Sequence, residues 1–177
     1  MTDKKYIIDG NYFHGVLSLG TNVQYAQPNA GGTTARANSY LLNKQIEAFE
    51  PEYLMRLFGL NFSVALYTYL RRGDTSEVEE RWETLLSLLR ADDGGVSPIA
   101  AYVYFRILET RQAHVTETGV SLGAGDDAAS PVPLQVQAWG LMVDANAVIL
   151  DYVKENFTEY DICFTPAILE RVNSLGL

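Results

Sequence analysis

The sequence is poor in cysteine, histidine and basic residues. Its 177 residues include one cysteine, two histidines, and 13 Lys and Arg against 22 Asp and Glu. A single cysteine excludes an internal disulfide framework. The net charge of −9 argues against nucleic-acid binding as the main function, because such binding needs clustered basic side chains.

Long apolar runs are missing as well. None approaches the roughly 20 residues that a membrane helix needs, so we expect no membrane contact. The N-terminus lacks the apolar core of a signal peptide. We therefore expect the protein in the cytosol, or in a particle assembled there. The hydrophobic content of 47% is ordinary for a globular chain, and a chain of this length can bury a stable core without disulfides or metal ions.

Catalytic and metal-binding motifs are also missing. His14 and His114 lie far apart, whereas a zinc site needs three or four ligands at close spacing. Cys163 lies between Ile162 and Phe164, which predicts a buried structural thiol. The glycine-rich segments lack the ligand pattern of a calcium loop and the lysine of a phosphate-binding loop. We expect no metal, no cofactor and no enzyme activity.

The periodicity of apolar residues predicts a mainly α fold, a helical bundle of five or six helices. Helical signals begin near Asn38 or Ser39, so we divide the chain into an N-terminal arm, residues 1–38, and a helical domain, residues 39–177. The arm has little helical pattern. A locally packed, irregular lead-in is an equally good interpretation of it.

Proline, glycine and serine predict where several helices begin and end. Pro51 is expected to open a new helix, because a residue before proline is pushed out of helical geometry. Gly59 is expected to end that helix. Ser97 and Pro98 form a strong helix start, which leads into a helix that is apolar on most sides and ends near Gln112. Such a helix is normally central to its domain.

The acidic residues before Trp82 have a structural interpretation. Ser76 and Glu79 match a capping box, in which each side chain satisfies a backbone amide at the start of a helix. Glu79 and Glu83 are four residues apart and share a helix face. We interpret them as part of a solvated helix face rather than as a catalytic carboxylate pair.

Two long helices are separated by a polar, glycine-rich segment, residues 116–129. It has few core-forming residues, and its alternation from Thr118 to Leu122 predicts a long loop or a short β-hairpin. Pro131 or Pro133 opens the last long helix. A segment that adds nothing to the core is expected to contact another molecule. The 11 tyrosines suit either a core or a protein interface.

The order of these motifs resembles a family of head–tail connector, or adaptor, proteins of tailed phages and prophages of gut bacteria. The similarity covers roughly residues 38–160. It is carried by the stretch from Ile46 to Leu60, Trp82 in its amphipathic helix, the stretch from Ser97 to Phe105, and the stretch from Thr118 to Trp139.

The resemblance implies a structural virion protein with a helical connector-like domain, assembled in the host cytoplasm. Its subunits would form a homo-oligomeric ring at the portal vertex, between portal and tail-side virion proteins. DNA would pass through without specific binding, which suits an acidic chain. The long loop would make the intersubunit contact, and the N-terminal arm would suit docking on an adjacent ring. The predicted contact residues are Thr118, Gly119, Val120, Ser121 and Leu122.

Two functions of other classes stay open. One is a small regulatory helical protein that binds one partner through an apolar groove. The other is an enzyme whose pocket is built from carboxylates and tyrosines carried on helices.

Overall fold

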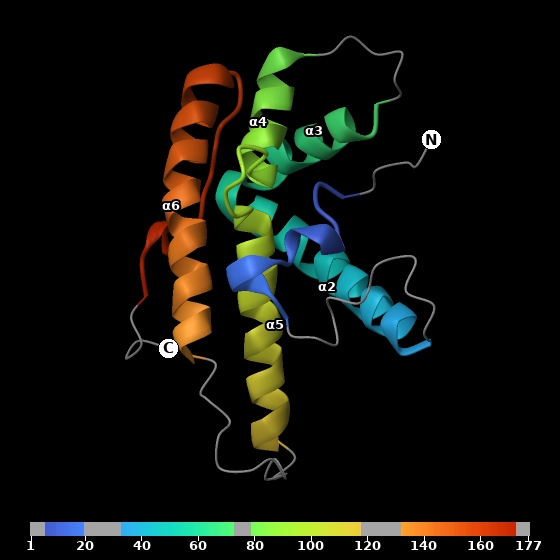
Figure 1. The fold of residues 1–177 in the computed structure, drawn as a ribbon. Coiled ribbons are helices and arrows are strands. Elements are labelled where there is room, and N and C mark those ends of the chain that lie inside the picture. The colour runs from blue at the N-terminus through green and yellow to red at the C-terminus, as the bar shows by residue number, and fades with distance from the viewer. Residues whose placement is uncertain (1–5, 20–32, 73–78, 118–131, 173–177) are drawn as a thin grey trace.

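The computed structural model describes residues 6–19, 33–72, 79–117 and 132–172. Within these parts the fold is a helical bundle without a strand, which confirms the predicted mainly α class (Figure 1). The α-helices are α2 (Thr33–Phe58), α3 (Leu60–Leu70), α4 (Glu80–Arg90), α5 (Pro98–Glu117) and α6 (Val132–Asn156), with short 3-10 turns η1 (Gly10–Tyr12), η2 (Gly15–Leu17) and η3 (Pro166–Leu169). No helix in the described parts combines the length and apolarity that a membrane span requires.

Helix α5 lies at the centre of the bundle, as its apolar sequence predicts. It packs along α6 and also contacts α2 and α4 (Figure 1). Each residue from Ile99 to Val103 is at most 1% exposed. A helix buried on every side needs apolar residues all round, which explains the unbroken apolar start of α5.

The start of α5 confirms Ser97 as its N-cap. The Ser97 hydroxyl accepts a hydrogen bond from the amide of Ala100 at 3.3 Å. The same hydroxyl donates to the carbonyl of Leu89 at 2.8 Å, near the end of α4. One side chain therefore caps α5 and fixes the turn that joins it to α4.

The prediction of a helix break at Pro51 is wrong. Helix α2 runs through Pro51 without interruption. A proline inside a helix removes one hydrogen bond and crowds the preceding turn. Here the residues on both sides of it are buried, including Ile46 before it and Tyr53 and Leu54 after it. Burial of a continuous helix face outweighs the local preference of proline.

Gly59 separates α2 from α3, as expected. Its φ of 81° lies in the region that favours glycine. A Cβ atom at this position would lie 3.1 Å from the carbonyl oxygen of Cys163. The thiol of Cys163 is exposed, so the prediction of a buried thiol is wrong. The amide of Cys163 donates to the carbonyl of Phe58, so this residue contacts the core through its backbone.

The N-terminal residues 6–19 pack against the bundle. Ile7, Ile8, Phe13 and Leu17 are buried in the common core. The alternative of a locally packed lead-in therefore holds for these residues. Helix α2 begins at Thr33, earlier than the predicted start at Asn38 or Ser39.

The predicted capping box does not form at Glu79. Helix α4 begins at Glu80, and Glu79 before it has extended backbone angles and no capping hydrogen bond from its side chain. Ser76 lies outside the described residues. The buried face of α4 is as predicted, with Trp82 and Leu85 at its centre. The carboxylate of Glu79 pairs with arginines instead of the helix end.

The chain after α6 folds back along it (Figure 1). The indole of Trp139 donates to the carbonyl of Glu170 at 2.7 Å. The buried amide of Asn146 donates to the carbonyl of Ile168 at 2.9 Å. These bonds hold η3, whose start at Pro166 follows the predicted helix signal.

Candidate functional site

The predicted contact residues, 118–122, lie outside the described residues. Their anchors are described: α5 ends at Glu117, five residues beyond the predicted end, and α6 begins at Val132. Both helix ends lie at the same end of the molecule, and α5 extends past the other helices there (Figure 1). The two described ends that flank residues 118–131 therefore lie at one end of the bundle.

A buried carboxylate anchors the N-terminal segment. Glu50 on α2 is 0% exposed. Its carboxylate accepts hydrogen bonds from the amide of Ile7 at 2.9 and 3.0 Å and from the amide of Ile8 at 3.1 Å. Tyr67 on α3 donates its hydroxyl to the same carboxylate at 2.9 Å. One side chain thus joins three segments that are distant in sequence.

Burial controls the protonation of this anchor. It raises the pKa of Glu50 from 4.5 to about 7, while the hydrogen bonds from Ile7, Ile8 and Tyr67 and the positive charge of Arg90 act in the opposite direction. Desolvation is the larger effect, because a charge buried in a helical core loses its water. The neighbouring Tyr67 has a raised pKa for the same reason, and the negative charge of Glu50 adds to it.

Arg90 closes the anchor from the side of α4. Its Nε donates to the carbonyl of Ile7 at 3.3 Å. The backbone of Ile7 is therefore held by a carboxylate at its amide and by a guanidinium at its carbonyl. This arrangement orients the N-terminal segment and leaves the carboxylate enclosed by its own donors.

Carboxylate–tyrosine pairs recur elsewhere between helices. They join α2 to α3, α2 to α5, and α3 to α4, so each pair lies at a different junction. In each pair the phenol donates to the carboxylate. The pairs are Glu50–Tyr67 at 2.9 Å, Glu52–Tyr102 at 2.8 Å and Glu83–Tyr69 at 2.9 Å.

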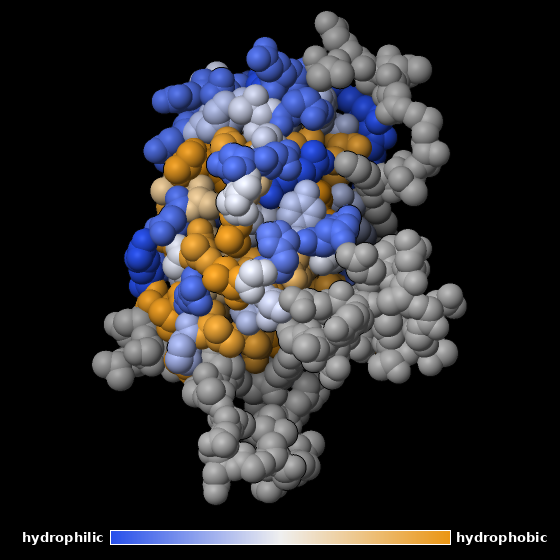
Figure 2. Space-filling model, viewed as in Figure 1, coloured by the Kyte–Doolittle hydropathy of each residue, from blue (hydrophilic) through white to orange (hydrophobic). Residues whose placement is uncertain are grey.

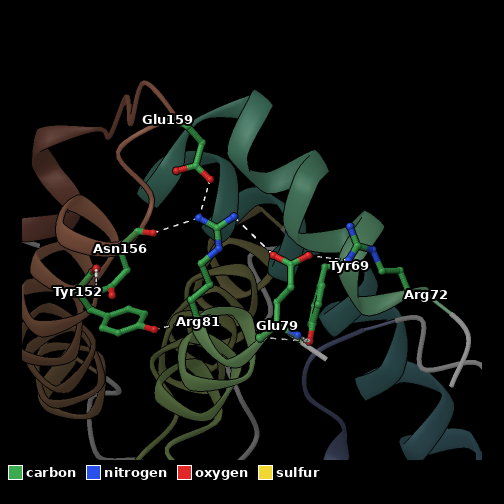
Figure 3. Close-up of polar contacts among 7 residues, drawn as sticks. All are labelled: Tyr69, Arg72, Glu79, Arg81, Tyr152, Asn156 and Glu159. Carbon is green, nitrogen blue, oxygen red and sulfur yellow. Dashed lines mark hydrogen bonds and ion pairs between the residues drawn. The ribbon is translucent and has the colours of Figure 1, made fainter. Parts of the chain in front are cut away.

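An exposed polar cluster links α3, α4 and the end of α6 (Figure 3). Arg81 forms ion pairs with Glu159 at 2.6 Å and with Glu79 at 3.5 Å. It also donates to the carbonyl of Asn156 at 3.2 Å. Glu79 pairs in turn with Arg72 at 2.8 Å. The hydrogen bond from Arg72 is the main reason that the pKa of Glu79 is lowered.

The same cluster rests on aromatic rings. Arg81 lies over the ring of Phe157 at 4.8 Å. Tyr152 on α6 donates its hydroxyl to the carbonyl of Arg81 at 3.0 Å (Figure 3). Both arginines form ion pairs with carboxylates and lie over aromatic rings, so the cluster links the helices to one another. As an exposed network that solvent screens, it stabilises the junction only modestly.

An open apolar groove lies between α4 and α6. Its volume is about 510 Å³. Neither the Glu50 anchor nor the Arg81 cluster lines it. The side chains that line it are mostly apolar, and Val148 among them is 60% exposed. Its lining includes Leu88, Ala91, Val96, Leu141, Ala145 and Val148.

In the described parts no three His, Cys, Asp or Glu side chains are grouped as a metal site. His14 is exposed. Comparisons with models of known families, with curated proteins and with solved structures find no match.

Sequence reasoning missed both the Glu50 anchor and the groove. The only sequence signal for the Glu50 anchor was a charged residue between Phe49 and Pro51. Its burial becomes visible only in the fold. The groove had a visible signal. Leu134, Leu141 and Val148 are spaced by seven residues, a spacing that places them along one side of a helix.

Proposed function

We propose that this protein is a structural virion protein of a tailed phage, a head–tail connector subunit that forms a ring at the portal vertex. The ring is a homo-oligomer between portal and tail-side proteins, with no enzyme activity of its own. DNA passes through it without specific binding. The motif order that carries the resemblance supports the proposal. Two of its stretches, from Ile46 to Leu60 and from Ser97 to Phe105, contribute residues such as Tyr53 and Tyr102 to the core.

The arrangement of α5 and α6 is the observation that carries the proposal. The two helices pack along each other, and α5 ends at the same end of the bundle at which α6 begins, with α5 extending further (Figure 1). Burial of α5 continues to Leu108, so the pair is fixed in the core before it reaches that end. A fixed pair of helices that presents a polar segment suits a head-to-tail contact, the kind that closes into a ring.

The N-terminal residues contribute differently. Residues 6–19 are held on their own bundle by Glu50, so the proposal assigns them to the subunit core and not to a neighbouring ring. The net charge of −9 supports a ring around DNA, because an acidic surface does not retain the passing phosphate backbone.

A loop replacement tests the proposal. Residues 118–122 are replaced by a Gly–Ser sequence of equal length, which keeps the connection between α5 and α6. We expect an unchanged circular dichroism spectrum and an unchanged melting temperature, together with loss of the ring particles that the unaltered protein forms. If the variant still forms rings, the segment is not the intersubunit contact. If it unfolds, the segment belongs to the core.

The groove between α4 and α6 favours a second function, a helical module that binds one partner. Its exposed apolar lining has no role in the ring contact proposed above. The two functions are compatible in one subunit, because the groove is lined by the sides of α4 and α6 and not by the helix ends at Glu117 and Val132.

A further inference from the structure

The outer face of α6 carries an apolar row that continues beyond the groove. Leu134, Leu141 and Val148 recur every seven residues, so they lie along one side of the helix. Leu134 is 43% exposed and Val148 is 60% exposed. Hydrophobic residues gather over α6 on the face shown in Figure 2. The row is long enough to follow a second helix over several turns.

The apolar row has an acidic border. Asp144 and Asp151 lie four residues before and three residues after Val148, on the same side of α6, and both are exposed. Asp93 lines the opposite wall of the groove. Arg171 pairs with Asp144. Among the described residues no other basic side chain forms an ion pair with these three carboxylates.

We propose that this groove binds an amphipathic helix with basic flanks, supplied by a different protein. An amphipathic helix places residues spaced by three, four and seven into such a groove, which matches the spacing of the apolar row on α6. Lysine and arginine on its flanks complement the carboxylates of Asp93 and Asp151, which form no ion pair with another described residue. A second copy of this chain is disfavoured as the occupant, because the net charge of −9 and the acidic border oppose it.

This inference is independent of the ring. It concerns the sides of α4 and α6, whereas the proposed ring contact concerns residues 118–122, between α5 and α6 in the chain. The groove variants below leave residues 118–122 unchanged, so loss of peptide binding and loss of rings are separate results.

A designed peptide serves as the probe. It is a fluorescent helical peptide of about three heptads, with leucines in an apolar stripe and lysines on the flanks. Its binding to the full chain is followed by fluorescence anisotropy. We expect saturable binding that weakens as salt is added. Two comparison peptides are a lysine-flanked peptide whose leucines are shuffled out of the stripe, and a peptide with glutamate in place of lysine. Both are expected to bind about tenfold more weakly or worse.

Two matched variants decide the location of binding. Val148→Asp places a charge in the groove, and Val64→Asp places the same charge on α3, where Val64 is 56% exposed. Both add one negative charge, so a difference between them reports the apolar contact. We expect Val148→Asp to weaken binding about tenfold or more, and Val64→Asp to leave it unchanged. Equal affinity of the two variants, or equal binding of the shuffled peptide, would overturn the proposal in favour of unspecific charge attraction. Equal binding of the glutamate peptide would overturn the assignment of a basic partner.

Discussion

The hydroxyl of Tyr67 donates a hydrogen bond of 2.9 Å to the buried carboxylate of Glu50. The same carboxylate holds the amides of Ile7 and Ile8. The pair therefore connects α2, α3 and the N-terminal segment at a point that water does not reach. Several measurable properties of the protein depend on this connection.

Removal of the Glu50 side chain should release the N-terminal segment. Glu50→Ala leaves the amides of Ile7 and Ile8 and the hydroxyl of Tyr67 without their acceptor, and each unpaired buried group costs about 1–3 kcal/mol. We expect the free energy of unfolding to fall by about 3 kcal/mol. The Ile7 and Ile8 amides should also exchange faster with deuterium. The control Glu47→Ala, which removes an exposed partner of Lys44, should change stability by less than about 0.5 kcal/mol.

The raised pKa of Glu50 predicts an unusual pH dependence. Its value of about 7 in the folded protein exceeds the ordinary 4.5, so the folded state binds this proton more tightly than the unfolded state. The part of the Glu50 contribution that depends on its proton is therefore fully present below pH 4.5 and is lost as the pH rises to about 7. Its hydrogen bonds to Ile7, Ile8 and Tyr67 are a separate contribution.

Comparison with Glu50→Gln isolates this effect from other titrating groups. The free energy of unfolding of the unaltered protein, minus that of the variant, should fall by on the order of 3 kcal/mol across that pH range. Urea unfolding at several pH values measures it. A difference that stays constant with pH would mean that Glu50 keeps its ordinary pKa.

Asn146 is a second buried polar residue with a testable role. It accepts a hydrogen bond from the hydroxyl of Tyr53 and donates to the carbonyl of Ile168. Asn146→Ala leaves both partners unpaired, so we expect a loss of about 2–3 kcal/mol and weaker docking of η3. The matched control is Asn156→Ala, because the side chain of the exposed Asn156 bonds to the carbonyl of Tyr152 in its own helix, and the backbone carbonyl that accepts from Arg81 is kept. Thermal unfolding of both variants tests the role, and equal losses would contradict it.

Gly59 should tolerate alanine less well than Gly94 does. Both have positive φ, 81° and 91°, so both substitutions carry backbone strain of about 1 kcal/mol. A Cβ at Gly59 also meets the carbonyl of Cys163 at 3.1 Å, whereas a Cβ at Gly94 meets nothing within 4 Å. We expect Gly59→Ala to cost about 2 kcal/mol and Gly94→Ala about 1 kcal/mol in denaturant unfolding. Equal costs would show that the contact with Cys163 is relieved without penalty.

Local sequence signals predicted those parts of the fold that local interactions decide. Ser97 caps α5 as expected, because a serine before a proline satisfies the helix end by itself. Gly59 separates two helices as expected, because its positive φ ends α2 at this point. The helix break predicted at Pro51 does not occur, because Ile46 and Tyr53 on either side of it are buried by tertiary packing, which a local pattern does not show.

The candidate sites were harder to predict for the same reason. The partners of Glu50 come from residues 42 and 43 positions earlier and 17 positions later in the chain, so no local pattern marks them. Glu79 was predicted to cap a helix, but its carboxylate forms ion pairs with Arg72 and Arg81 instead. The predicted contact residues from Thr118 to Leu122 lie outside the described residues, and their role stays a prediction.

The mass of the full-length protein in solution tests the central proposal most directly. Sedimentation velocity over a range of concentrations, with negative-stain images of the same samples, measures it. The proposal predicts a closed assembly many times larger than the 19.7 kDa subunit, seen as rings with a central opening. A single folded species of 19.7 kDa at every concentration, both alone and with the portal protein present as a template, would contradict it.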